Sequence, residues 1–298
     1  MSTGITVEVI RGSTTYDFTD WIDWGLVGTF GFGMVPSHRL TQRGPMQHGE
    51  TDVGFRLDAA TFGFTVGMKA LSLSDQYALR QTMIRAFAPT AEALQVRVTL
   101  PDGEVRQRDA YLVDGLSFES GNFSGFYGEI PVRLVAPDPT WYDPAGDAAT
   151  FALGGSEDTG GVVPEPVPTF VGASVLNASV AVTYGGTWLE YPRIRITGPI
   201  TDPVITNVTT GEVLDFTDTT IGAGEWYELD LRYGYKTILD DSGANVVGDL
   251  TSDSDLATWH LAADPEAADG INNITVTGSA ATSATSVHLV WFERYLGI

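Results

Sequence analysis

Alternation of apolar and polar residues with a period of two recurs along this chain. Successive side chains of a β-strand point to opposite faces, so this spacing is typical of strands with one buried face. The segment 94–100 shows it clearly, because Val96, Val98 and Leu100 share one face while Arg97 and Thr99 share the other. The pattern predicts a mainly β chain.

Turn-forming residues separate the expected strands. The 298 residues include 34 glycines and 15 prolines, which suits a chain with many tight turns. The segment 101–103, Pro-Asp-Gly, predicts a hairpin turn between the strand 94–100 and a return strand that begins at Glu104. A second antiparallel pair is expected from residues 111–118 and 127–135, joined by the glycine-rich segment 120–125.

One segment has the periodicity of a helix. Ser72 and Ser74 offer N-caps, and Leu79, Met83 and Phe87 then recur every fourth residue, with Ile84 widening the apolar stripe. Pro89 follows and stops the pattern. We expect a helix over about residues 74–88 that packs this stripe on a sheet.

Charge and composition divide the chain near residue 144. Residues 1–144 carry 11 basic and 17 acidic residues, whereas residues 145–298 carry 5 and 21. Residues 145–171 are rich in glycine and proline, which suits either a free linker or, as we prefer, a strand and long loop that open a second domain. Short strands resume after 175 at the spacing of a β-sandwich. We expect an N-terminal domain at 1–144 and a C-terminal β-sandwich at 145–298.

The segment at the boundary between these regions is expected to have a rigid backbone. Pro137, Pro139 and Pro144 each fix the backbone angle φ. Trp141 and Tyr142 lie among them and have the size to wedge between two domains. We therefore interpret these five residues as a rigid interdomain connector.

No pattern for catalysis or cofactor binding is present. The sequence has no cysteine, its four histidines lack metal-ligand spacing, and no nucleophile or phosphate-binding motif occurs. The acidic segment 240–245 has oxygen ligands for Ca²⁺ but not the required register, and a hairpin turn explains the same residues. We expect no enzyme, no cofactor and no metal site, with structural or surface roles for the histidines.

The net charge of −22 disfavours binding to nucleic acid or to anionic membranes. No apolar stretch approaches the roughly 20 residues of a membrane span, and no signal peptide is recognisable. We therefore expect a protein made in a cytoplasm, without membrane insertion or sequence-specific nucleic-acid binding.

Seven tryptophans are the other chemical feature of the chain. Most are expected to fill cores. Trp226 and Trp259 flank turn-rich segments, which makes them the candidates for stacking a sugar at the surface.

Two ordered groups of residues resemble the distal tail protein family of siphovirus-type, long-tailed bacteriophages. The first is the connector segment 134–143, and the second is the segment 184–199 with 202–207, 209–212 and 270–274. The segment 44–49, the helix and the hairpin 94–108 fit the N-terminal half of that family. The resemblance spans nearly the whole chain.

This resemblance implies a ring-forming, tail-tube-like N-terminal β-domain with one helix and a galectin-like C-terminal β-sandwich. It implies a homohexameric adaptor ring at the tail tip of the virion, which joins the tail tube protein to the tip or baseplate hub protein. Tape measure and receptor-binding proteins are the further partners it suggests. Two alternatives stay open, namely a module that binds host carbohydrate through the C-terminal sandwich, and a tail tube subunit.

Overall fold

The computed structural model describes residues 4–20, 22–118, 123–124, 126–152 and 176–298. The chain forms two compact units, Met1–Pro144 with Tyr295–Ile298, and Ala145–Arg294. It therefore passes between the units twice, after Pro144 and after Arg294. Whether 1–144 and 145–298 fold as independent domains stays a prediction.

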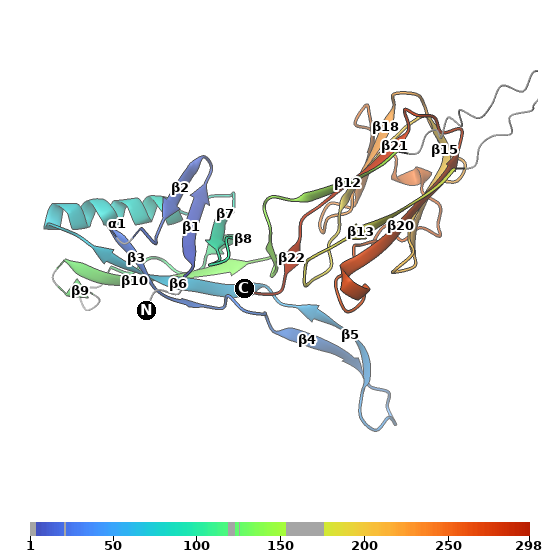
Figure 1. Cartoon of the computed structure of the whole chain (residues 1–298). Helices are drawn as coiled ribbons and strands as arrows, with labels where there is room; N and C mark the ends of the chain where they lie inside the picture. Colours follow the sequence, from blue (N-terminus) through green and yellow to red (C-terminus); the bar gives the residue numbers. More distant parts are fainter. Residues whose placement is uncertain (1–3, 21, 119–122, 125, 153–175) are drawn as a thin grey trace, which may run out of the picture. The chain divides into compact units, whose positions relative to one another are not determined.

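The first unit is built on one large sheet, whose strand order is β2-β1-β7-β8-β10-β6-β3 (Figure 1). Three short strands extend it, since β9 pairs with β10, β11 with β8, and β22 with β11. A separate two-stranded sheet consists of β4 and β5. The elements are β1 (Thr6–Arg11), β2 (Thr14–Asp17), β3 (Trp24–Phe30), β4 (Ser37–Gln42), β5 (Thr51–Leu57), β6 (Ala60–Lys69), α1 (Leu73–Phe87), β7 (Leu94–Thr99), β8 (Val105–Leu112), β9 (Phe123–Ser124), β10 (Tyr127–Ala136), β11 (Trp141–Tyr142) and β22 (Arg294–Tyr295).

The expected helix is confirmed as α1, which lies over one face of the large sheet (Figure 1). The Ser72 hydroxyl caps it by accepting a hydrogen bond from the Asp75 backbone N–H at 3.1 Å. Phe87 packs on Phe18, with ring centres 5.6 Å apart. Ile84 does not join this buried stripe, because its side chain is 43% exposed. The helix thus keeps apolar surface on its outer side.

The hairpin between β7 and β8 is also confirmed, with Leu94 opposite Ala110 and Thr99 opposite Val105. The second expected pair, 111–118 with 127–135, is confirmed only at one end, where Tyr111 and Leu112 lie opposite Val135 and Leu134. Strand β8 ends at Leu112, and β10 pairs along its whole length with β6. That pairing places the alternating apolar face of β10 beside Phe62 and Phe64, both fully buried. Residues 120–122 and 125 of the expected loop lie outside the described residues.

The second unit is a β-sandwich of two antiparallel sheets that share one apolar core. The strand orders are β12-β21-β14-β18-β19 and β13-β20-β15-β16, with β17 paired to β15. Of the strand and long loop expected over 145–171, the strand is confirmed as β12, and residues 153–171 lie outside the described residues. The elements are β12 (Asp147–Ala152), β13 (Leu176–Thr183), β14 (Arg193–Thr197), β15 (Ile200–Asn207), β16 (Glu212–Asp215), β17 (Thr220–Ile221), β18 (Trp226–Asp230), β19 (Thr237–Asp240), η2 (Val247–Asp249), η3 (Ala268–Gly270), β20 (Ile271–Ser279) and β21 (Ser286–Trp291).

The close approach of strands around Gly63 gives a test of this sheet. A Cβ at Gly63 would lie 2.0 Å from the Val132 carbonyl oxygen and 2.8 Å from Phe30 Cζ. We expect Gly63→Ala to lower the free energy of unfolding by at least about 2 kcal/mol, because the backbone must move to relieve the clash. Urea unfolding of the first unit measures this. Gly28→Ala is the control, since no atom lies within 4 Å of its added Cβ, and equal losses in both variants would contradict the β3-β6-β10 packing.

Candidate functional site

Titratable groups do not converge into a catalytic cluster in the described part of the chain, and no group of three His, Cys, Asp or Glu side chains there is placed to hold a metal ion. His38 Nε2 lies 2.5 Å from Asp58 Oδ2 on an exposed strand pair. His288 Nδ1 lies 2.8 Å from Thr150 Oγ1 between neighbouring strands. These are the contacts of surface and structural histidines. No helix among the described residues has the length and apolar character to span a membrane.

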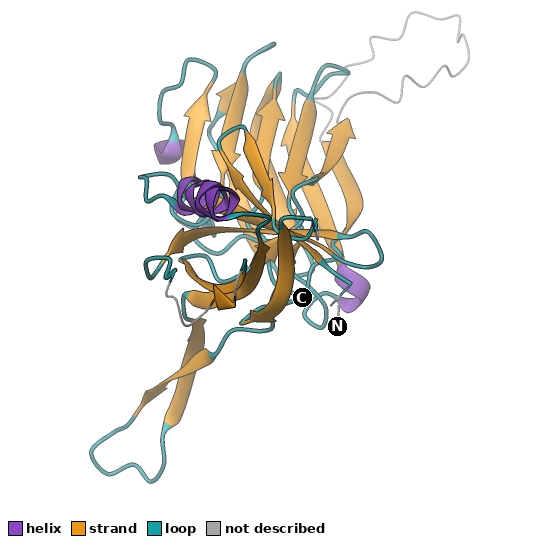
Figure 2. Cartoon of the chain, turned by 90° about the vertical axis from the view of Figure 1, so that its left-hand side faces the viewer, coloured by secondary structure: helices purple, strands orange, loops and turns teal. Residues whose placement is uncertain are grey.

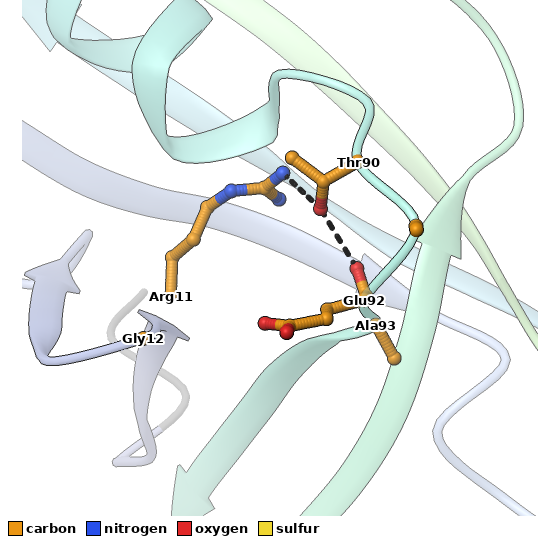
Figure 3. A pocket seen from close by; sticks show the side chains of 6 residues that line it. Arg11, Gly12, Thr90, Glu92 and Ala93 are labelled. Carbon is orange, nitrogen blue, oxygen red and sulfur yellow. Dashed lines mark hydrogen bonds between the residues drawn. The ribbon is translucent and has the colours of Figure 1, made fainter.

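One open hollow of about 430 Å³ lies beside the loop that follows α1 (Figure 3). Its charged side chains are Arg11 and Glu92. The Arg11 guanidinium donates to the Ala88 carbonyl and, at 2.7 Å, to Thr90 Oγ1. Since Arg11 is engaged in fastening this loop to β1, the hollow is a structural junction.

The segment considered for Ca²⁺ is a turn whose carboxylate is already engaged. Asp240 Oδ1 accepts hydrogen bonds from Ser242 N at 2.9 Å, Ser242 Oγ at 2.7 Å and Ala244 N at 2.8 Å. Asp240 therefore closes the turn after β19, which is the structural alternative given by the sequence.

The connector is fastened to the first unit by a buried cation. Arg108 on β8 is fully buried, and its guanidinium donates to the carbonyl oxygens of Pro139 and Thr140. The guanidinium carbon lies 4.1 Å from the ring centre of Trp141. Burial lowers the pKa of Arg108 to about 9, and the nearby carboxylate of Asp138 opposes this shift. The planar guanidinium thus bonds and stacks on the connector at once.

Trp141 of the expected connector is a core residue of the first unit. Its side chain is fully buried, and its ring lies 5.4 Å from Phe32 and 5.5 Å from Phe62, centre to centre. Tyr142 is tied to the same unit, because its hydroxyl accepts from Gln107 Nε2 at 2.8 Å. Trp141 and Tyr142, in the middle of the connector, are therefore fixed to the first unit. The interdomain connector role of all five residues, Pro137, Pro139, Trp141, Tyr142 and Pro144, stays a prediction.

Replacement of Arg108 tests this anchor. We expect Arg108→Met to lower the free energy of unfolding of the first unit by about 2 kcal/mol, because two buried carbonyls lose a charged donor. Arg108→Lys should restore less than half, since an ammonium has no planar fork. Thermal and urea unfolding measure both, with Arg133→Met as the control because the Arg133 side chain is 59% exposed. An Arg108→Met variant as stable as the wild type would mean that desolvation of the cation outweighs its bonds.

An exposed arm is the feature of the first unit that the sequence did not predict. Within the described residues, strands β4 and β5 pair with each other and with no further strand, from Ser37 opposite Leu57 to Gln42 opposite Thr51. The pair reaches away from the large sheet (Figure 2). We call residues 37–57 the arm.

Leu57 packs on the core of the first unit, whereas the apolar side chains further along the arm are exposed. Leu40 is 44% exposed, Val53 62% and Phe55 48%, and Met46 in the connecting loop is 92% exposed. An isolated two-stranded hairpin is marginally stable in water, and its free edges offer unpaired backbone groups. The arm therefore has the composition of a segment that is covered by another chain.

Of the two tryptophans expected to stack sugars, one is buried, and the role of the other, Trp226, stays a prediction. Trp259 is fully buried in the core of the second unit, which corrects its assignment to the surface. Trp226 on β18 is partly buried, and the Arg195 guanidinium carbon lies 4.3 Å from its ring centre. Exposed aromatic rings of this unit belong instead to Tyr233 and Tyr235. A Tyr-Gly-Tyr sequence between two alternating strands was the available signal.

Lys236 follows these tyrosines, and its amine is buried against an aromatic ring. Its Nζ lies 3.7 Å from the ring centre of Tyr191 and, among the described residues, has no hydrogen-bond partner. Burial lowers its pKa to about 8, against the opposing effects of Glu212 and Asp230. The folded state therefore favours the neutral amine more than the unfolded chain does.

This shift predicts a pH dependence. Between about pH 8 and 10.5 the unfolded chain binds more protons at Lys236 than the folded chain, so the lysine's contribution to stability rises with pH. We expect the wild type to gain stability relative to Lys236→Met over this window, as measured by urea unfolding of the second unit. Lys69→Met is the matched control, since Lys69 is the chain's other lysine and is exposed. A difference that stays flat with pH would contradict the buried placement of Lys236.

Comparison with solved structures gives a match along the whole chain. The crystal structure of the SPP1 Dit protein (gp 19.1) aligns with a TM-score of 0.63 and 13% sequence identity, covering 97% of this chain and 98% of that one. The chain has the SPP1 Dit fold. This confirms at the level of fold the resemblance to distal tail proteins, and with it the mainly β architecture with one helix.

Two structures of the phage P2 baseplate in its activated conformation, with Ca and with Sr, align less well. Their TM-scores are 0.45 and 0.46, each with 9% identity over 96% of this chain and 97% of the other. No protein-family model matches the sequence, and no curated protein does.

Proposed function

We propose that this chain is a non-enzymatic ring subunit at the distal end of a phage tail, which joins the tail tube to the tip or baseplate hub. The observation that carries the proposal is the fold shared with SPP1 Dit over 97% of the chain. That protein is described as a paradigm of the hub adsorption apparatus in phages that infect Gram-positive bacteria. The match covers nearly the full length of both chains, so it supports a similar structural role for this chain.

The arm supports a ring in particular. A ring closes through heterologous contacts, in which one surface of a subunit meets a different surface of the next. The arm supplies the first surface, and the first unit offers exposed apolar residues outside it, among them Leu73, Tyr77 and Ile84 on α1. Burial of both surfaces in one contact would remove them from water.

The assembled ring is a hexamer in this proposal, located at the tail tip of the virion after synthesis in the host cytoplasm. Its partners are the tail tube protein, the hub protein, the tape measure protein and receptor-binding components. The net charge of −22 supports a ring around a DNA passage, because an acidic surface does not hold phosphate.

Electron microscopy of the purified protein tests the proposal. We expect hexameric rings that stop at one or two layers, alone or after addition of the hub protein. Long polymers would favour the alternative of a tail tube subunit. A chain that stays monomeric by light scattering, alone and with tube and hub proteins, would contradict the ring.

Substitutions on the arm test its part in the contact. Val53→Ser with Phe55→Ser should weaken ring assembly at least about tenfold while the melting temperature of the monomer stays unchanged, since both side chains are exposed before assembly. Native mass spectrometry over a concentration series measures this. Tyr111→Ser with Val113→Ser is the control pair, exposed in the same unit but outside the arm. Rings that persist in the arm variant would remove the arm from the interface and leave the ring itself in place.

A further inference from the structure

The first unit has an exposed apolar cluster at the end of its large sheet where α1 begins. Ile22 is 74% exposed, Leu71 84% and Phe126 45%. Backbone hydrogen bonds bring their segments together, because the Lys69 N–H donates to the Asp23 carbonyl at 2.9 Å and the next N–H along the chain donates to the Phe126 carbonyl at 2.9 Å. We call Ile22, Leu71 and Phe126 the end patch.

The end patch and the arm lie at opposite ends of β6. The arm ends at Leu57, three residues before β6 begins at Ala60, and the end patch lies beside Lys69, where β6 ends. Ten residues of extended strand span roughly 30 Å. The arm and β9, which precedes Phe126, are likewise far apart in Figure 1. Because the arm also reaches away from the sheet (Figure 2), it leaves the end patch of its own subunit uncovered.

The charges of the two surfaces are complementary. The arm, residues 37–57, has three arginines against Glu50 and Asp52, a net charge of +1 in a chain of net charge −22. The segments that carry most of the end patch, 17–24 and 69–77, have four aspartates and one lysine, a net charge of −3. Opposite charges attract at the short distances of a protein contact. The end patch therefore favours the arm electrostatically as well as by its apolar side chains.

The outer face of α1 is the competing surface for the arm, and its charge has the wrong sign. Its exposed apolar residues include Tyr77 and Ile84. Beyond the first turn, residues 76–87 contain Arg80 and Arg85 and no acidic residue. Basic side chains there repel a basic arm, so the end patch is the better counter-surface.

Two charged residues are placed to meet in such a contact. Arg43 in the connecting loop of the arm is exposed, and its Nε donates to the Gln47 carbonyl at 3.3 Å. Asp23 follows Ile22 of the end patch directly. Neither charge is used in an ion pair among the described residues. Each is therefore available to a partner of opposite charge.

We propose that the arm of one subunit packs on the end patch of the next subunit, and that Arg43 meets Asp23 in this contact. The occupant of the end patch is thus a second copy of this chain. This contact rests on the ring proposed above and specifies which surface receives the arm. Because the two surfaces lie at opposite ends of β6, each copy gives one and receives one, as a heterologous contact requires.

Substitution of the end patch is the first test. Ile22→Ser with Leu71→Ser should weaken ring assembly at least about tenfold and leave the melting temperature of the monomer unchanged, because both side chains are exposed before assembly. Tyr77→Ser with Ile84→Ser on α1 is the matched control, and its rings should persist. Native mass spectrometry over a concentration series measures both. Rings that persist in the end-patch variant would overturn the contact.

Mixing two variants tests the pairing itself. The end-patch variant keeps an intact arm, and Val53→Ser with Phe55→Ser keeps an intact end patch. Each should be monomeric alone, whereas their equimolar mixture should form a one-to-one dimer that cannot grow, since its remaining two surfaces are damaged. Isotope labelling of one chain identifies the heterodimer by native mass spectrometry. A mixture without heterodimer at the highest concentration would contradict the pairing of arm and end patch.

A charge exchange tests the polar part of the contact. Arg43→Glu and Asp23→Arg should each weaken assembly, most strongly at low salt, where charges are screened least. The two changes together should restore at least part of the loss. Arg133→Glu is the control, since this exposed arginine lies outside both surfaces. No recovery in the combined variant would remove the Arg43–Asp23 contact.

The outcomes separate this contact from the ring itself. A wild-type chain that stays monomeric with its tube and hub partners contradicts the ring. Wild-type rings that are lost in the α1 variant but kept in the end-patch variant contradict the end patch alone and assign the arm to α1.

Discussion

The hydrogen bonds and ring contacts of the buried Arg108 guanidinium hold the segment around β11 in the first unit. It reaches from β8 to the carbonyls of Pro139 and Thr140 and stacks on Trp141, which places β11 next to β8. Strand β22 then pairs with β11, so both passages of the chain between the units begin beside strands that Arg108 helps to fix. Burying a cation is costly, and here hydrogen bonds and two aromatic faces offset the cost, since Phe62 also lies 5.0 Å away. Lysine has neither the fork nor the plane for this arrangement.

Parts of the fold that depend on local sequence were predictable. The helix has its own cap at Ser72 and its own stop at Pro89, and the β7-β8 hairpin has a turn with alternation on both sides. Partners separated in sequence were not predictable in this way. Nothing in residues 127–135 indicates that β6, some sixty residues earlier, is a longer partner than the neighbouring β8. The predicted surface position of Trp259 was wrong for the same reason. Its turn-rich flanks are local in sequence, whereas the core that buries it is formed by residues distant in sequence.

The arm escaped prediction because its exposed apolar residues do not follow the alternation of a strand with one buried face. Period-two reasoning works by asking which face meets the core. In β4, Ser-His-Arg-Leu-Thr-Gln, every residue is exposed, so neither face of the strand is buried and no apolar alternation is needed. Tyr233 and Tyr235 alternate as core residues do, and only the structure shows that they lie beyond the end of β18 in a turn.

The uneven charge of the two units favours contacts between copies through the first unit. The first unit has a net charge of −6 and the second −16, since Tyr295–Ile298 adds no charge to the first. Identical subunits repel one another in proportion to the square of the charge that they bring together, within a screening length of about 8 Å at physiological salt. Contacts between copies therefore cost least through the first unit, where the arm lies. The second unit carries the larger negative charge, so it repels both its own copies and anionic polymers more strongly.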